Sequence, residues 1–130
     1  MARVLVLEDN EDIAGLVHHI LTRDGHAVEV AADGTRGWEQ VLRATYDVVI
    51  VDRVMPGLDG IEFVRACRAS PHLRDVPVLM LTARALPIEV QQGLDAGVTT
   101  YMTKPFVPQQ LSALVARLVR GDEGPDTVHP

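Results

Sequence analysis

Apolar residues recur along this chain with two different spacings. Runs of four consecutive apolar residues, which indicate buried strands, occupy positions 4–7, 48–51 and 78–81. Positions 26–31 and 98–103 are weaker β-rich segments. After four of these five segments, apolar residues return at helical spacing, and after positions 78–81 a proline and a glycine mark the bounds of a further helix. The pattern therefore predicts five strands, each followed by a helix.

The predicted helices each present one apolar face. The apolar positions that define four of these faces are Ile13, Leu16, Val17, Ile20 and Leu21; Trp38, Val41 and Leu42; Ile61, Val64 and Cys67; and Leu111, Leu114, Val115 and Leu118. Gly25 and Gly97 are expected to end helices, and Pro87 is expected to open one. Asp33 followed by Gly34 is typical of a turn or a helix cap.

Strict alternation of strand and helix predicts an α/β fold, a parallel sheet with helices on both faces. Uninterrupted apolar runs suit strands that are buried on both sides. A closed barrel of alternating strands and helices would take eight units and a much longer chain. The expected fold is thus a flavodoxin-like, doubly wound (βα)5 sheet with the strand order 2-1-3-4-5.

The length of 130 residues corresponds to one domain. With 47% hydrophobic and 23% charged residues, the composition is that of an ordinary globular protein. We expect a folded domain over residues 1–120. Residues 121–130 are polar, acidic and interrupted by Gly and Pro, which predicts a disordered tail or the start of a linker.

The net charge of −6 disfavours direct binding to nucleic acid and docking on anionic lipid. Cys67 is the only cysteine, so an internal disulfide is excluded and a reducing compartment fits best. No apolar run approaches the length of a membrane span. These features together favour a cytoplasmic protein without membrane contact.

Polar residues follow the predicted strands at the points where those strands end. In a doubly wound sheet, functional groups gather beyond the carboxyl ends of the strands, where the strand order reverses. The residues at these ends are Glu8 and Asp9, Asp52, Thr82 and Lys104. We therefore expect five polar side chains that are distant in sequence to lie in one small region.

Three carboxylates in one region repel one another. A bound Mg²⁺ would remove that repulsion, because this ion prefers oxygen ligands and is commonly held by one or two carboxylates. Asp9 and Asp52 are the candidate ligands, with Glu8 acting directly or through a water. The backbone carbonyl of Arg53 is a candidate to complete the set.

The remaining groups suit the transfer of a phosphoryl group. Lys104 supplies a positive charge and Thr82 a hydroxyl donor, and such groups neutralise a phosphoryl group in transfer. A carboxylate can act as the nucleophile and form an aspartyl phosphate. Asp52 is the best candidate because it follows the central strand.

The chain resembles the receiver domain of two-component response regulators, from Arg3 to about Val119. The segments that carry the resemblance are Leu7-Glu8-Asp9-Asn10, Asp52 with Met55-Pro56-Gly57-Leu58-Asp59-Gly60, Leu81-Thr82-Ala83 and Tyr101-Met102-Thr103-Lys104-Pro105-Phe106. The resemblance implies that Asp52 accepts a phosphoryl group from a phosphohistidine on a sensor histidine kinase or a histidine phosphotransfer protein. It also implies that Glu8 and Asp9 are the family's acidic pair and that Lys104 is its active-site lysine. In this family the peptide bond between that lysine and the following proline is often cis.

The resemblance also implies how a signal would pass through the phosphorelay. Thr82 would move toward the phosphate, and Tyr101 would turn inward into the space left behind. The surface of the fourth helix, fifth strand and fifth helix would then change for a downstream protein target or a phosphorylation-dependent dimer. This describes a phosphoacceptor switch that assists its own phosphotransfer and slow dephosphorylation, rather than an enzyme with a separate substrate.

The sequence departs from the usual receiver pattern at several positions. Glu8 stands where Asp is most frequent, and Thr99-Thr100 stand where many receivers carry an acidic pair. Val54 and Arg84 occupy the two variable positions that tune phosphate lifetime in this family.

Each site residue also has a simpler explanation when it is taken alone. Acidic residues favour helix N-termini, Asp52 could belong to a turn, Thr82 could cap a helix, and Tyr101 could serve packing alone.

Three other functions suit the fold or the nucleophile: a flavin carrier, an aspartyl phosphatase and a pure interaction module. The acidic segment 8–12 would repel a flavin phosphate, and Val54 replaces the second Asp of such phosphatases. Both a stand-alone regulator and a receiver from a larger protein remain open.

Overall fold

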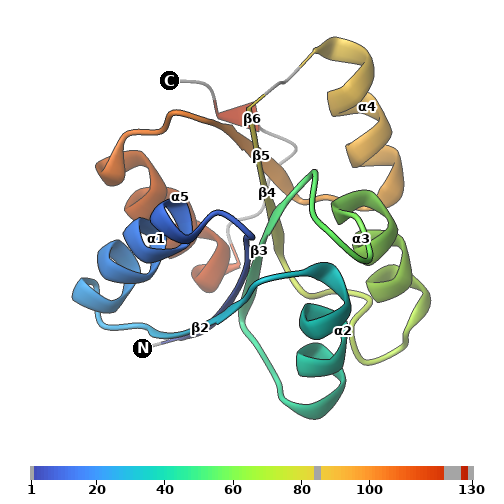
Figure 1. The fold of residues 1–130 in the computed structure, drawn as a ribbon, viewed down its shortest axis with the longest axis horizontal. Coiled ribbons are helices and arrows are strands. Elements are labelled where there is room, and N and C mark those ends of the chain that lie inside the picture. Colours follow the sequence, from blue (N-terminus) through green and yellow to red (C-terminus); the bar gives the residue numbers. More distant parts are fainter. Residues whose placement is uncertain (1, 84–85, 122–126, 129–130) are drawn as a thin grey trace.

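The computed structural model describes residues 2–83, 86–121 and 127–128. Strands and helices alternate along this part of the chain (Figure 1). They are β1 (Arg3–Leu7), α1 (Glu11–Arg23), β2 (Ala27–Ala31), α2 (Gly34–Arg43), β3 (Val48–Asp52), α3 (Gly60–Ala69), β4 (Val78–Thr82), α4 (Pro87–Ala96), β5 (Thr100–Thr103), α5 (Pro108–Arg120) and β6 (Thr127–Val128). Among these residues, no helix combines the length and the apolar character needed to cross a membrane.

The sheet has the strand order β2-β1-β3-β4-β5-β6, and every neighbouring pair is parallel. The predicted order 2-1-3-4-5 is confirmed, and the two-residue β6 extends the sheet beyond β5. Within the tail that the sequence predicts as disordered, Thr127 and Val128 pair with Tyr101 and Met102. Residues 122–126 and 129–130 of that tail lie outside the described residues.

Two apolar cores sandwich the sheet, because successive strand side chains point to opposite faces. Leu5, Leu7 and Val51 face a core that includes residues of α2 and α3, whereas Val4 and Val6 face a core with α1 and α5. Figure 1 shows α1 and α5 on one side of the sheet and α2, α3 and α4 on the other. Nearly all residues of β1, β3 and β4 are buried, as their uninterrupted apolar runs predict.

Two leucines from the predicted apolar helix faces lie at the surface instead. Leu16 is 46% exposed and Leu42 is 50% exposed. In each helix the valine next to the leucine in sequence, Val17 in α1 and Val41 in α2, is buried and faces the sheet instead. A leucine one position away is rotated by about 100° around the helix axis, toward solvent.

Side-chain caps fix where three helices begin. Asn10 Oδ1 accepts a hydrogen bond from the backbone N–H of Ile13 at 3.0 Å, and Asp33 caps α2 in the same manner. Asp59 Oδ1 accepts from the backbone N–H of Glu62 at 3.0 Å and caps α3. Because α1 and α3 begin soon after β1 and β3 end, their N-termini lie near the carboxyl edge of the central strands.

The only cysteine provides a test of the packing beneath α3. Cys67 is fully buried, and burial raises the pKa of its thiol to about 11. Because the thiolate is the reactive form, we expect an aromatic disulfide reagent at pH 8 to react at least ~100-fold more slowly with native protein than with protein in urea. The released thiolate is followed by absorbance, and rapid reaction of the native protein would contradict this packing.

Candidate functional site

Three carboxylates lie together at the carboxyl edge of the sheet. One oxygen of each of Glu8, Asp9 and Asp52 lies within 4.8 Å of the other two. The register of the central strands produces this group, since Leu7 pairs with Val51 and the acidic residues come next. Glu8 is buried, Asp52 is half-buried and Asp9 is exposed, so the cluster opens toward solvent on one side.

Lys104 lies between two of these carboxylates. Its Nζ is 2.7 Å from Glu8 Oε1 and 3.3 Å from Asp52 Oδ2. Its backbone N–H donates to the carbonyl of Thr82 at 2.8 Å, and the bond to Pro105 is cis. Lys104 is the only lysine in the chain. Lysine carries a compact charge with three donors on a flexible stem, so it can bridge two oxygens and re-orient toward a third.

Burial raises the pKa of Glu8 above its usual value. The hydrogen bond from Lys104 opposes this shift, as does the backbone N–H of Asn10, which donates to Glu8 Oε2 at 3.1 Å. The negative charge of Asp52 adds to the increase in pKa. Burial thus disfavours the charged form of Glu8, and nearby positive charge offsets part of that cost.

Thr82 ends β4 beside the same group of residues and is only 4% exposed. Together with Asp52 and Lys104 it lines a pocket of about 250 Å³. The complete lining of this pocket is Asp52, Arg53, Val54, Thr82, Ala83, Glu89 and Lys104. A carboxylate, a hydroxyl and an ammonium therefore share one open pocket, as the strand ends predict.

The loop after β3 shapes the other wall of the pocket. The backbone N–H of Val54 lies 3.4 Å from Asp52 Oδ1, and the Val54 side chain is 75% exposed. The carbonyl of Arg53 accepts a hydrogen bond from the N–H of Gly60 at 3.0 Å, which occupies one of its two lone pairs. Its role as a metal ligand stays a prediction. Arg84 lies outside the described residues.

Tyr101 lies inward, between the sheet and α4. It is 1% exposed, and its hydroxyl donates to the carbonyl of Glu89 at 3.3 Å. Burial raises the pKa of this phenol. A Cβ atom at Gly93 would overlap the Tyr101 hydroxyl, so the glycine leaves the space in which this ring lies. Sequence reasoning singles out Tyr101 but misses Gly93, whose only signal is a small residue within a helix.

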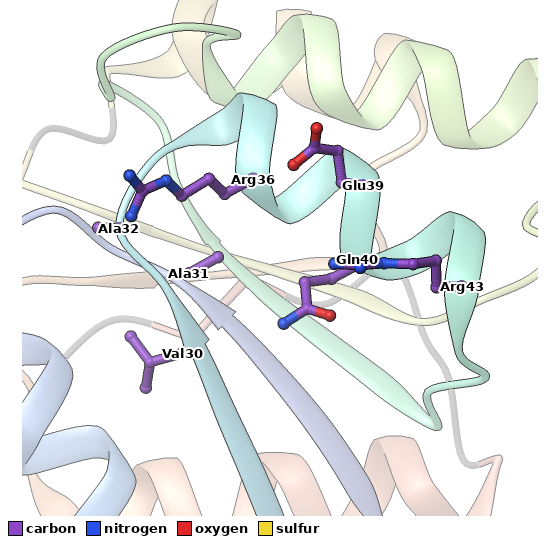
Figure 2. Close-up of a pocket in the computed structure, with 7 residues that line it drawn as sticks. All are labelled: Val30, Ala31, Ala32, Arg36, Glu39, Gln40 and Arg43. Atoms are coloured by element: carbon purple, nitrogen blue, oxygen red, sulfur yellow. The ribbon is translucent and has the colours of Figure 1, made fainter.

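A second hollow lies elsewhere, between β2 and α2 (Figure 2). Its volume is about 340 Å³, which exceeds that of the pocket beside Asp52. The residues around it are Val30, Ala31, Ala32, Arg36, Glu39, Gln40 and Arg43. It has a single carboxylate and two guanidinium groups, and it does not bring several carboxylates together as the cluster around Asp52 does.

Comparison with known proteins places the chain in a family. The family described as the response regulator receiver domain matches residues 4–116, and the chain belongs to it. It is similar to YrkP of Bacillus subtilis, an uncharacterized transcriptional regulatory protein, with 44% identity over 118 residues. That match covers 91% of this chain and 49% of YrkP, so the chain spans about half the length of this relative.

Solved structures agree with this assignment. The chemotaxis protein CheY4 of Vibrio cholerae is 38% identical, with a TM-score of 0.87 over 91% of this chain and 98% of that chain. The receiver domain of sensor histidine kinase PA1611 from Pseudomonas aeruginosa is 32% identical, with a TM-score of 0.85 over 92% of this chain and 98% of that chain. The latter was solved with a magnesium ion coordinated in its active site cleft. The chain is thus a receiver domain with a CheY-type fold, as its motifs predict.

Proposed function

We propose that Asp52 accepts a phosphoryl group from the phosphohistidine of a sensor histidine kinase or a histidine phosphotransfer protein. The observation that supports this role best is the position of Lys104, whose Nζ lies 3.3 Å from Asp52 Oδ2 in a pocket that also contains Thr82. The positive charge of Lys104 would therefore lie beside the negative oxygens that Asp52 gains when it is phosphorylated.

The reaction is a displacement at phosphorus. A carboxylate oxygen of Asp52 forms a bond to phosphorus as the phosphorus–nitrogen bond of the donor breaks, and the electron pair stays on the imidazole nitrogen, which then takes a proton. Lys104 and the Thr82 hydroxyl would stabilise the oxygens of the transferred group, and their place in the same pocket as Asp52 supports this role. The exposed side of the cluster leaves an approach for the donor.

The three carboxylates fit a Mg²⁺ ion. Glu8, Asp9 and Asp52 supply oxygen ligands close enough to one another for shared coordination. Asp9 and Asp52 would hold the ion, with Glu8 acting directly or through a water, because Glu8 is already bound by Lys104. When bound, Mg²⁺ would neutralise charge on the phosphoryl oxygens.

We further propose that phosphorylation shifts a two-state equilibrium through Thr82 and Tyr101. A change from about 1% to 99% of the active state needs about 5.5 kcal/mol of differential binding. Charge-assisted hydrogen bonds of about 1.5–3 kcal/mol each can supply this from Lys104 and Thr82. The affected surface would be α4, β5 and α5, where a downstream protein or a second receiver would bind.

The region similar to this chain covers 49% of YrkP, a transcriptional regulatory protein. In a longer protein of that kind, a second domain would contact DNA and this domain would control it. The net charge of −6 disfavours direct contact between the receiver itself and nucleic acid.

The proposal predicts that acetyl phosphate labels the wild-type chain once per molecule when Mg²⁺ is present. The adduct should be an acyl phosphate, since a carboxylate is the nucleophile, and hydroxylamine should remove it. Intact-protein mass spectrometry detects both results, with EDTA as the control for the metal. No adduct, or an adduct that resists hydroxylamine, would overturn the proposal.

A further inference from the structure

The main chain of Arg53 is held on two sides, directly after the proposed phosphoacceptor. Its N–H donates to the carbonyl of Leu81 at 3.3 Å, in β4. Its carbonyl accepts from the N–H of Gly60 at 3.0 Å, at the start of α3. Any displacement of the loop at Asp52 therefore also moves the base of the Arg53 side chain.

The Arg53 side chain extends from this anchor to α4. Its Nη1 donates to the carbonyl of Glu89 at 3.3 Å, and its Nη2 donates to Gln92 Oε1 at 3.0 Å. Its Nε lies 4.0 Å from Glu89 Oε2, and the side chain is only 18% exposed. The planar guanidinium thus binds one turn of α4 through several groups at once.

Helix α4 buries little apolar side-chain surface. Its buried residues are Gly93 and Ala96, which have almost no side chain to bury, and its Val90 and Leu94 pack against the core only partly buried. Helix α5 instead buries Leu111, Leu114 and Val115 among others. Leu86, the N-cap residue of α4, provides no side-chain hydrogen bond to the start of the helix, and the same is true of Val107 at α5. Helices with little buried apolar surface shift most readily, so the hydrogen bonds from Arg53 can bias the position of α4.

The same turn of α4 also holds the inward Tyr101. The carbonyl of Glu89 accepts from both the Arg53 guanidinium and the Tyr101 hydroxyl, each at 3.3 Å. A carbonyl oxygen has two lone pairs and can accept both bonds. Arg53 and Tyr101 consequently meet at one atom of the helix, although Arg53 comes from the loop after β3 and Tyr101 from β5.

We infer that Arg53 is a positioning residue that couples the Asp52 site to α4 and holds Tyr101 in its inward position. This inference deepens the proposed function and rests on it, because the inward tyrosine is the conformation assigned to the phosphorylated state. A movement of the loop at Asp52 shifts the Arg53 guanidinium and, with it, the Glu89 carbonyl. That shift changes the hydrogen bond from the Tyr101 hydroxyl to the same carbonyl.

The test compares Arg53→Met with Arg65→Met, alone and in a Tyr101→Phe background. Methionine keeps the apolar stem and removes the donors; Arg65 is an exposed arginine of α3 that lines the same groove as Arg53. The first readout is the ring signal of Tyr101 in protein with ¹³C-labelled tyrosine, which the Tyr101→Phe variant distinguishes from Tyr46, the only other tyrosine. The second readout is the rate of labelling by acetyl phosphate.

Arg53→Met should move the Tyr101 ring signal toward that of a solvent-exposed tyrosine and lower the labelling rate about fivefold to twentyfold. Arg65→Met should change the rate by less than about twofold, and in the Tyr101→Phe background Arg53→Met should lose most of its effect. Equal effects of the two arginine variants, or an unchanged Tyr101 ring signal in Arg53→Met, would overturn the inference. The Tyr101 ring signal can be measured without phosphorylation. An unchanged ring signal would therefore contradict the role of Arg53 alone, whereas a wild type that is not labelled would contradict the proposed function.

Discussion

Asp52→Asn is expected to abolish labelling by acetyl phosphate, to below about 1% of the wild-type rate. The amide is the same size as the carboxylate but is not a nucleophile, so the bond to phosphorus cannot form. The measurement is the mass of the intact protein after incubation with Mg²⁺ and the phosphodonor. Asp75→Asn, which changes an exposed carboxylate outside the cluster, should be labelled as fast as the wild type.

Stability separates lost chemistry from lost folding in this variant. Asp52 adds negative charge beside Glu8, whose pKa it helps to raise, so removal of that charge relieves repulsion in the folded state. The substitution also removes the ion pair between Asp52 and Lys104, but Lys104 keeps its shorter contact with Glu8. Asp52→Asn should therefore unfold in urea at the same concentration as the wild type or at a higher one. An Asp52→Asn protein that folds and is still labelled with a hydroxylamine-labile group would show that another carboxylate is the acceptor.

The convergence of the site residues could be predicted because it follows from topology alone. Apolar runs identify β1, β3 and β4, and in a parallel sheet the residues after these strands lie at one edge. Glu8, Asp9 and Asp52 meet for this reason, and no knowledge of side-chain orientation is needed. Thr82 and Lys104 reach the same pocket because β4 and β5 continue the sheet in order.

Features that depend on the placement of one helix could not be predicted in this way. An arginine in a loop is usually a solvated surface residue, and nothing in its neighbours indicates that Arg53 reaches α4. The inward place of Tyr101 likewise depends on Gly93 lying opposite its hydroxyl. These contacts arise from the approach of α4 to the sheet, which the period of apolar residues does not specify. The pairing of Thr127 with Tyr101 is not predictable either, because a strand of two residues is too short to show an alternation of apolar and polar positions.

Gly60→Ala is expected to lower the free energy of unfolding by about 2–3 kcal/mol, as overpacking against a fixed neighbour does. A Cβ atom at Gly60 would overlap the carbonyl oxygen of Asp52 and lie 2.9 Å from the Cα of Arg53. Both neighbours are backbone atoms, one in the last residue of β3 and one in the residue after it, so no side-chain rotation relieves the contact. Urea unfolding followed by circular dichroism measures the change.

Gly15→Ala is the matched control, since this glycine lies on the exposed face of α1 with no atom within 4 Å of the added Cβ. Alanine there should raise the free energy of unfolding by about 0.5–1 kcal/mol, because it favours the helix over the unfolded chain. Opposite signs for the two substitutions would mean that α3 closely abuts the strand that carries Asp52. If Gly60→Ala proved as stable as Gly15→Ala, the start of α3 would have to lie farther from Asp52, and the hydrogen bond from Gly60 to Arg53 would be lost with it.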